Sequence, residues 1–294
     1  MEPTIISKRN KQIGKRKQIK NLLKPMVKFT FECGFIFFNS IVRNSVLYGT
    51  EVMYKLIEQE KRKIEKLEEG HLKNIFKVDT GIQIPLHLMY LDGGQIPARY
   101  QIGRFRLNYF QYILQQNDSS LLYSMLTAQE NFPTKNDWYS EVQNNIKEFN
   151  INLSNSETKS MNRKQFHRIT RQKSTEQAFQ CLIQKKEKGK KGNILKYKNK
   201  LQMADYLCPN IFLDLEDQRL LFQIRSETNQ LPANKGNPGP CPMDCGSLLL
   251  NNPHILQCSV LNTGEKCTYE GLVNGNLKQM KENLTIWRVK HGKS

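Results

Sequence analysis

The feature of this sequence that most constrains its folding is a group of metal-ligand residues near the C-terminal end. Between Cys241 and Cys258 the chain reads CPMDCGSLLLNNPHILQC, which contains three cysteines and one histidine. The short spacing lets Cys241 and Cys245 turn back toward one point, and on a helix His254 and Cys258 would point the same way. Together they form a Cys3His set, which suits tetrahedral Zn²⁺. We therefore predict a structural zinc site at Cys241, Cys245, His254 and Cys258.

A closed zinc site would supply the fold that the C-terminal segment cannot obtain from a core of its own. Metal binding at such a site contributes on the order of 10 kcal/mol to the folding of a small module. Because protein fills all four ligand positions, the metal would have no open position for catalysis. Two alternatives stay open: Cys267 replaces Cys258 as a ligand, or the cysteines pack as small apolar groups without a metal.

The net charge is the second strong signal, and it bears on the partner rather than on the fold. The chain has 45 Lys and Arg against 27 Asp and Glu, a formal net charge of +18. Basic residues concentrate in 1–28 and 163–200, whereas 51–70 is close to neutral. Such an excess repels itself, so it indicates an anionic partner: nucleic acid, an anionic membrane or an acidic protein. Two separate basic blocks favour RNA or DNA over a merely solvated lysine-rich surface.

The apolar and cysteine patterns bear on the compartment. The most apolar run, from Phe29 to Val42, includes Glu32 and Asn39 and is too short to cross about 30 Å of hydrocarbon. It also starts too late for an ordinary signal peptide. The seven cysteines are odd in number and mostly isolated, which does not suggest a secreted disulfide framework. We expect no membrane partner and a nuclear or cytoplasmic protein that is not secreted.

Apolar side chains recur at helical spacing through most of the chain, and strand patterns are sparse. The spacing predicts helices at 50–76, 86–91, 99–116, 119–129, 137–149, 163–184, 194–208 and 213–229. Residues 150–162, NINLSNSETKSMN, are rich in Ser and Asn and are the best linker candidate. The chain is therefore predicted to be mainly α.

These patterns divide the chain into four parts. They are a basic arm at 1–28, a helical domain at 29–149, a basic linker and helix at 150–200, and a basic helix with the zinc module at 201–294. The string KKEKGKKGN interrupts the third part as a solvated break, and the loop LPANKGNPGP leads into the cysteine cluster.

Two stretches, in this order, resemble the C-terminal part of the reverse transcriptases of non-LTR retrotransposons. The first holds IVRNSVLYGTEV, KRKIEKLEEGHLKNIF and LHLMYLDGGQIPARYQIGRFRLNYFQYIL, and is similar to the helical thumb that follows the palm. The second, DQRLLFQIRSETNQLPANKG with the cysteine cluster after it, is similar to a basic helix followed by a CCHC knuckle. The resemblance covers most of residues 30–262. It implies a thumb-like helical bundle, a basic linker and a small zinc-stabilised C-terminal module.

The catalytic carboxylates of that family are missing from this sequence. Reverse transcription uses carboxylates that hold two metal ions, and the family places two of them in a Y/F-x-D-D turn, but the chain has no Asp-Asp pair. We therefore expect no catalytic residues and a nucleic-acid-binding fragment without polymerase activity of its own. Two alternatives remain: an RNA-directed DNA polymerase whose palm another chain supplies, or a protein-interaction module built on the zinc site. A nuclease based on Asp214, Glu216 and Asp217 is disfavoured, because acids at a helix start more often interact with its dipole.

The resemblance and the charge pattern together assign nucleic-acid contacts to three groups of basic residues. A thumb that tracks the template–primer duplex would place Arg99, Arg104 and Arg106 on phosphates, although plain surface arginines fit the same pattern. The second basic block would add salt-sensitive affinity without sequence preference, through Lys185, Lys186, Lys188, Lys190 and Lys191. Arg219 and Arg225 lie where the family's basic helix approaches RNA or target DNA, and Phe222 between them is expected in the core.

Overall fold

The computed structural model describes residues 31–53, 58–76, 84–134, 137–187, 198–208, 215–226 and Cys245. Within these ranges the chain is mainly helical, which confirms the predicted fold class at that level. The described ranges hold no strand, and one isolated antiparallel bridge joins Gly93 to Met203. None of the described helices combines the length and the apolarity that crossing a membrane requires.

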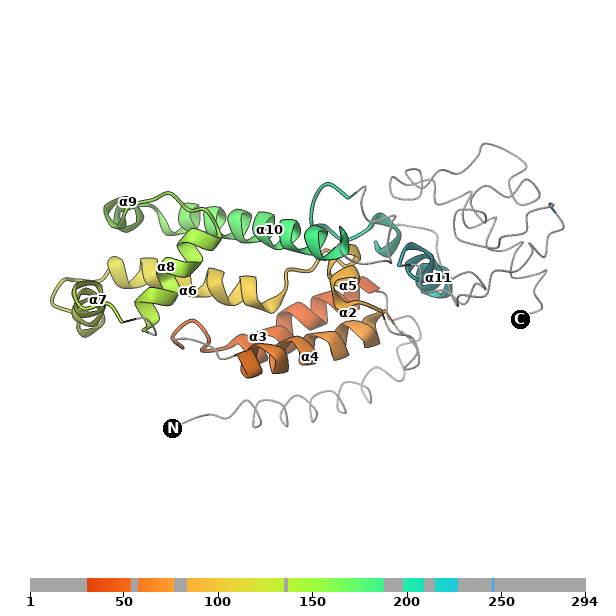
Figure 1. Ribbon diagram of the computed structural model, residues 1–294, viewed down its shortest axis with the longest axis horizontal. Helices are drawn as coiled ribbons and strands as arrows, with labels where there is room; N and C mark the ends of the chain where they lie inside the picture. The colour runs from red at the N-terminus through yellow and green to blue at the C-terminus, as the bar shows by residue number, and fades with distance from the viewer. Residues whose placement is uncertain are drawn as a thin grey trace. The chain divides into compact units, whose positions relative to one another are not determined.

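Figure 1 shows the order of the elements along the chain. The α-helices are α2 (Phe31–Phe37), α3 (Asn44–Leu47), α4 (Glu58–Ile75), α5 (Leu86–Asp92), α6 (Ala98–Leu114), α7 (Leu121–Asn131), α8 (Trp138–Glu148), α9 (Asn155–Ser160), α10 (Arg163–Glu187) and α11 (Leu215–Arg225). A π-helical segment, η1 (Phe38–Arg43), joins α2 to α3, and a 3₁₀ turn, η3 (Asp205–Leu207), precedes α11.

The chain forms two compact units, and each is described by itself. The first holds the described residues of Ile36–His71 and Ile96–Cys181. The second holds the described residues of 31–35, Leu72–Gln95, 182–187, 198–208 and 215–226. The four consecutive parts predicted from the sequence stay a prediction.

A buried ion pair joins η1 to α4 in the first unit. The guanidinium of Arg43 donates from Nε to Glu68 Oε1 at 2.7 Å, and both side chains are almost fully buried. The other carboxylate oxygen of Glu68 accepts from the backbone N–H of Ala98 at 2.9 Å, so Glu68 also satisfies an otherwise unpaired donor at the start of α6. This pair positions the beginning of α6 beside a core cluster that contains Val46 and Ile102.

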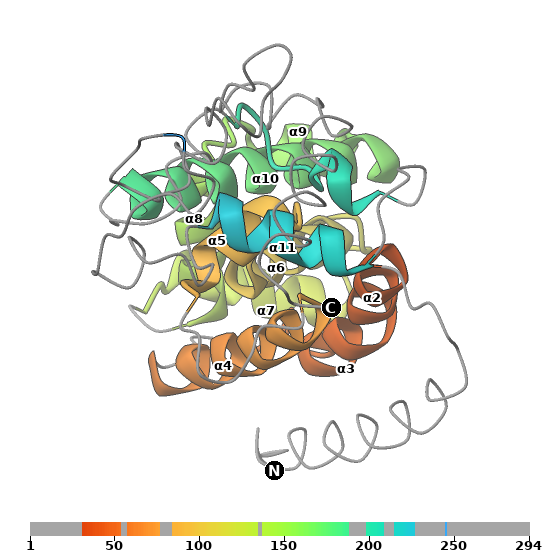
Figure 2. The ribbon, with the colours of Figure 1, turned by 90° about the vertical axis from the view of Figure 1, so that its right-hand side faces the viewer.

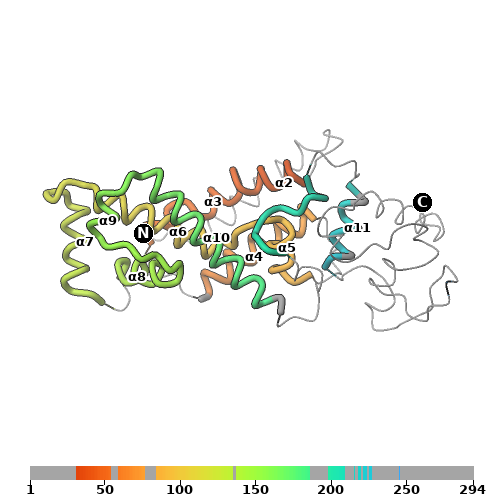
Figure 3. Tube along the Cα trace, turned by 90° about the horizontal axis from the view of Figure 1, so that it is seen from above, coloured from red at the N-terminus to blue at the C-terminus, as the bar shows by residue number. Residues whose placement is uncertain are grey.

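Helix α10 packs along α6 in the opposite direction, and the two lie side by side in Figure 1. Its buried side chains follow one another every four residues, which makes a narrow stripe along one face of a helix. They are Phe166, Thr170, Ser174, Ala178 and Leu182. The hydroxyl of Thr170 donates to Asn108 Oδ1 of α6 at 2.9 Å. Helices α7, α8 and α9 gather around the C-terminal part of α6 (Figure 3).

The predicted linker at 150–162 is instead an ordered part of the first unit. Helix α8 ends in a Schellman motif, in which Asn150 has a φ of 51° and Ile151 N–H donates to Ile146 C=O at 3.0 Å. Ser154 and Glu157 then form a capping box that starts α9. Gln111 of α6 donates to backbone carbonyls of this segment, including that of Met161 at 3.0 Å. Polar composition indicated a linker, but these residues use their polar groups as helix caps.

The second unit has its own core. One helix predicted in this unit is not formed in the described residues. Phe76 contacts Phe31 and Phe35 and stacks on Phe222 at 4.0 Å between ring centroids, which confirms Phe222 as a core residue. The described part of the predicted helix 194–208 is irregular apart from η3, and the backbone N–H of Ala204 donates to the carbonyl of Asp92 in α5 instead of to a helical partner.

Candidate nucleic-acid interface

The outward face of α10 is basic. Opposite the buried stripe, Lys164, Arg168 and Arg171 follow each other at spacings of four and three residues, and Arg163 stands beside them. All four side chains are exposed. The exposed Glu176 lies further along the helix, where Gln172 donates to it at 2.8 Å and Lys173 is 3.4 Å away. The start of α10 therefore presents positive charge that no carboxylate on its own outward face balances.

Arg104 of α6 adds to this positive surface, and its contact with phosphate stays a prediction. Burial lowers the pKa of the Arg104 guanidinium, and the positive charges of Arg171 and Arg43 lower it further. The guanidinium lies over the ring of Phe105, 5.1 Å from its centroid. Like charges held this close cost free energy, and a bound anion would offset that cost.

Arg99 and Arg106 lie differently, although the sequence pattern grouped them with Arg104. The side chain of Arg99 is 47% exposed, pairs with Glu148 at 3.3 Å and covers the ring of Tyr100. Arg106 is 3% exposed, and its guanidinium donates to Asn145 Oδ1 at 3.0 Å and to the backbone carbonyl of Met53 at 3.1 Å. The prediction that Arg106 contacts phosphate is therefore wrong, because this guanidinium is enclosed and already engaged within the first unit.

An open groove of about 480 Å³ lies next to α10, between α6 and the end of α3. Its apolar lining comes from Leu47 and four aromatic side chains: Tyr48, Phe105, Tyr109 and Tyr112. Its polar lining comes from Asn44, Glu51, Asn108 and Arg163. Arg163 belongs both to this groove and to the basic face of α10, so the two surfaces are continuous.

A tight turn after α3 presents Tyr48 to the groove. The N–H of Thr50 donates to the carbonyl of Leu47 at 3.0 Å, and Gly49 has a φ of 76°. A type II turn requires a positive φ at its third residue, which glycine adopts at little cost. Tyr48 occupies the second position of this turn, and its side chain is 80% exposed. The sequence Leu-Tyr-Gly-Thr thus presents an exposed tyrosine from a hydrogen-bonded turn.

Helix α6 supplies the other aromatic rings, and α8 holds them in place. Tyr109 and Tyr112 stand three residues apart on α6, and their rings lie 5.8 Å apart and are nearly parallel. Trp138, the first residue of α8, meets Tyr109 edge-on at 5.8 Å, and its indole N–H donates to the carbonyl of Glu51 at 2.7 Å. Trp138 therefore supports the Tyr109 ring and ties the turn after α3 to α8.

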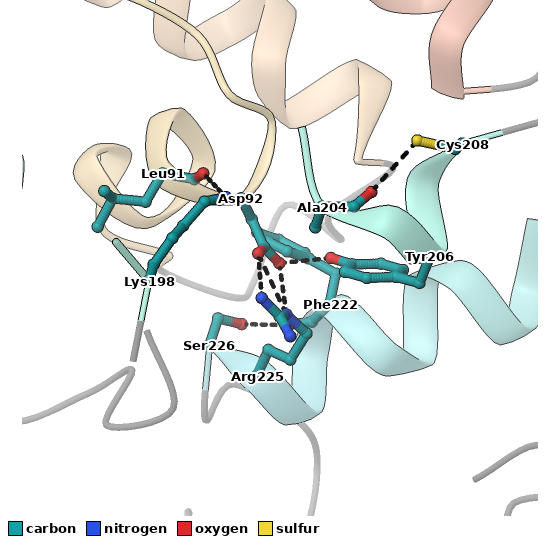
Figure 4. A network of polar contacts seen from close by, with 9 residues as sticks. All are labelled: Leu91, Asp92, Lys198, Ala204, Tyr206, Cys208, Phe222, Arg225 and Ser226. Atoms are coloured by element: carbon teal, nitrogen blue, oxygen red, sulfur yellow. Dashed lines mark hydrogen bonds and ion pairs between the residues drawn. The ribbon is translucent and has the colours of Figure 1, made fainter. Parts of the chain in front are cut away.

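Arg225, predicted to contact nucleic acid, is buried in the second unit. Figure 4 shows its guanidinium against the carboxylate of Asp92, with Nη2 donating to Oδ1 at 2.7 Å. The hydroxyl of Tyr206 donates to Asp92 Oδ2 at 2.5 Å. Helices α5 and α11, which carry this ion pair, lie next to each other in Figure 2. The predicted role of Arg225 is therefore corrected: its charge is neutralised inside the unit rather than offered to a phosphate.

The buried charges around Asp92 shift one another's ionisation. Burial alone would raise the pKa of the Asp92 carboxyl, but Arg225 and Lys198 hold it below its ordinary value. Burial lowers the pKa of Lys198 to about 8, against the attraction of Asp92. Lys198 also donates to the backbone carbonyl of Leu91. These buried residues join α5, the segment before η3, and α11. Their role is therefore structural, because they hold the three segments together.

The remaining predicted residues divide into described and undescribed positions. Arg219 is half-buried on α11, and Lys185 is exposed near the end of α10. The Lys186 side chain, together with Lys188, Lys190 and Lys191, lies outside the described residues, as do Cys241, His254 and Cys258. The described part of the chain contains no group of three or more His, Cys, Asp or Glu that could hold a metal ion. The zinc site at Cys241, Cys245, His254 and Cys258 therefore stays a prediction.

Sequence reasoning did not find the aromatic groove. Tyr109 and Tyr112 follow Phe105 at helical spacing and are indistinguishable in the sequence from core residues. Only Tyr48 carried a readable signal, because the glycine after it favours a turn and turns lie on the surface.

No family model, curated protein or solved structure matches this chain.

Proposed function

We propose that this protein binds RNA or DNA, as a thumb-like and zinc-containing C-terminal segment related to non-LTR retrotransposon reverse transcriptases. The observation that carries the proposal is the basic face at the start of α10, where Arg168 and Arg171 are exposed and Arg104 lies near Arg171. A phosphate backbone brings regularly spaced negative charges to such a face, and its binding releases condensed counterions.

The charge of the whole chain supports a polyanionic partner over a small anion. The formal net charge is +18, and the exposed basic side chains of α10 are spread along successive turns rather than gathered around one pocket. A single phosphate or carboxylate group would neutralise only one or two of them. A nucleic-acid strand contacts several at once, which predicts affinity with weak sequence preference and a strong dependence on salt.

The chain's resemblance to reverse transcriptases also supports a nucleic-acid ligand. A part in polymerisation is a separate proposal. A palm with the two-metal carboxylates, supplied by another chain, would make this segment part of an RNA-directed DNA polymerase. The isolated chain is expected to bind primer–template without extending it. If the purified chain extends a primer, the expectation that it lacks polymerase activity is wrong. The binding proposal would still stand.

A salt titration tests the binding proposal. Fluorescence anisotropy with labelled single-stranded and duplex oligonucleotides gives the apparent Kd at several salt concentrations. Removing two phosphate contacts with the variant R168Q/R171Q should weaken binding for all sequences alike. It should also make the slope of log Kd against log salt shallower by about 1.5 to 2.

The matched control removes the same charge from another helix of the first unit. Arg62 and Lys63 are exposed on α4, so R62Q/K63Q loses two positive charges away from the basic face. This control should keep most of the salt slope of the unmodified chain. Equal losses in both double variants would mean that only net charge matters, and no measurable binding at low salt would overturn the proposal.

A further inference from the structure

We propose that the aromatic groove beside α10 binds an unpaired base of single-stranded nucleic acid. The inference deepens the function proposed above and rests on it: the basic face would hold the backbone, and the groove would receive a base. The exposed residues Tyr48 and Tyr112 line the groove, and Arg163 connects it to the basic face.

The size and exposure of the groove fit a planar ligand. Its volume of about 480 Å³ lies within the range of about 300–1,000 Å³ typical of small-molecule sites. Tyr48 is 80% exposed and Tyr112 is 41% exposed. Exposed aromatic faces beside positive charge are the arrangement with which proteins stack the bases of single strands.

The polar groups of the groove are placed to read a base edge. Asn108 Oδ1 already accepts from Thr170, and within the described chain its amide nitrogen has no partner, so it is left to donate. Glu51 presents a carboxylate on the same groove, and carboxylates accept from exocyclic amino groups of bases. One donor and one strong acceptor would favour a base that offers an amino group next to an acceptor, as adenine, cytosine and guanine do.

The groove should not admit a paired base, because the faces of a base in a duplex are covered by its neighbours. A base reaches an aromatic platform only when it is unstacked, as in loops, ends and single strands. Binding through the groove should therefore separate single-stranded from duplex ligands, which the basic face alone does not do. RNA and DNA both present bases and phosphates, so the chemistry of the groove fits either. Parallel titrations with RNA and DNA oligonucleotides show which of the two binds more tightly.

The test replaces stacking rings by apolar side chains of similar reach. The double variant Y48L/Y112L keeps apolar surface in the groove and loses the π faces. Its affinity for a single-stranded oligonucleotide containing 2-aminopurine should fall by about tenfold or more, while its affinity for a duplex of equal length stays within about twofold. The fluorescence of 2-aminopurine should be quenched on binding to the unmodified chain, and this quenching should be lost in the double variant.

The control removes an exposed ring that lies elsewhere in the first unit. Phe132, after α7, is 81% exposed and does not line the groove, so F132L should leave both affinities and the quenching unchanged. Far-UV circular dichroism of each variant checks that the helices are intact.

The outcomes separate this inference from the proposed function. If R168Q/R171Q weakens binding but Y48L/Y112L changes neither single-strand affinity nor quenching, the groove inference is wrong and the nucleic-acid proposal stands. If the unmodified chain binds no oligonucleotide at low salt, both are wrong. Loss of single-strand and duplex affinity together in Y48L/Y112L would also overturn the inference, because stacking on an unpaired base cannot explain it.

Discussion

At the scale of single residues, the arginines of this chain divide by burial rather than by their spacing in the sequence. Arg106 and Arg225 are both 3% exposed and satisfied by oxygen acceptors, whereas Arg168 and Arg171 are exposed. A buried guanidinium requires partners inside the protein, because its desolvation is otherwise too costly. Arg225 meets this requirement through Asp92, which is fully buried.

Removing the charge of Asp92 should therefore destabilise the second unit strongly. The variant D92N leaves the guanidinium of Arg225 buried without a counter-charge, which should lower the free energy of unfolding by about 3–5 kcal/mol. Urea denaturation followed by circular dichroism measures this loss.

A matched substitution at a surface carboxylate serves as the control for D92N. Asp118 pairs with Lys159 at 3.0 Å, but its side chain is 74% exposed, so D118N should cost no more than about 1 kcal/mol. Similar losses in D92N and D118N would show that the Asp92 pair contributes no more than a surface ion pair.

At the scale of elements, local side-chain chemistry sets the start of α9 and the end of α8. Ser154 and Glu157 form the capping box of α9, and Asn150 takes the left-handed conformation that closes α8. Both signals can be read in the sequence, and both argue against the linker that composition suggested. Composition averages over residues, whereas a cap depends on two or three particular ones.

The turn after α3 offers a test at this scale. Gly49 has a φ of 76°, and a Cβ at this position would meet no atom within 4 Å, so only the backbone conformation opposes substitution. The variant G49A should therefore lower the free energy of unfolding by about 1–2 kcal/mol. It should also weaken single-strand binding, because the same turn positions Tyr48.

Asparagine at the same position provides the comparison. Asn adopts positive φ more readily than alanine, so G49N should lose less stability and less binding than G49A. Thermal unfolding and the anisotropy titration measure the two properties. A larger loss in G49N than in G49A would contradict a purely conformational role for Gly49.

At the scale of the whole molecule, we predict that the C-terminal segment binds a zinc ion. The purified chain should contain one zinc ion, measured by elemental analysis, and a chelator should increase proteolysis after residue 226. The variant C258S should lose the metal and C267S should keep it, since Cys258 completes the predicted ligand set. Absence of stoichiometric zinc, or loss of the metal in C267S alone, would contradict the predicted ligands.

The sequence by itself determined the helices and the charge of this protein. Helical periodicity predicted α5, α6, α7, α8 and α11 near their observed positions, because this signal arises within a few turns of chain. The excess of basic residues likewise needs no structure to be counted. The predicted helix at 194–208 failed because the described part of this segment is held by a backbone bond to Asp92, more than a hundred residues away in sequence.

Only the tertiary structure decided which of these residues face outward together. Tyr48 and Arg163 lie far apart in the sequence and line one groove, while Arg104 and Arg106 lie two residues apart and differ in burial. Burial is set by the elements that pack on each face of a helix, and the residues of one helix do not encode which neighbour covers which face. The candidate site is therefore a product of packing, whereas the helices that carry it are a product of local sequence.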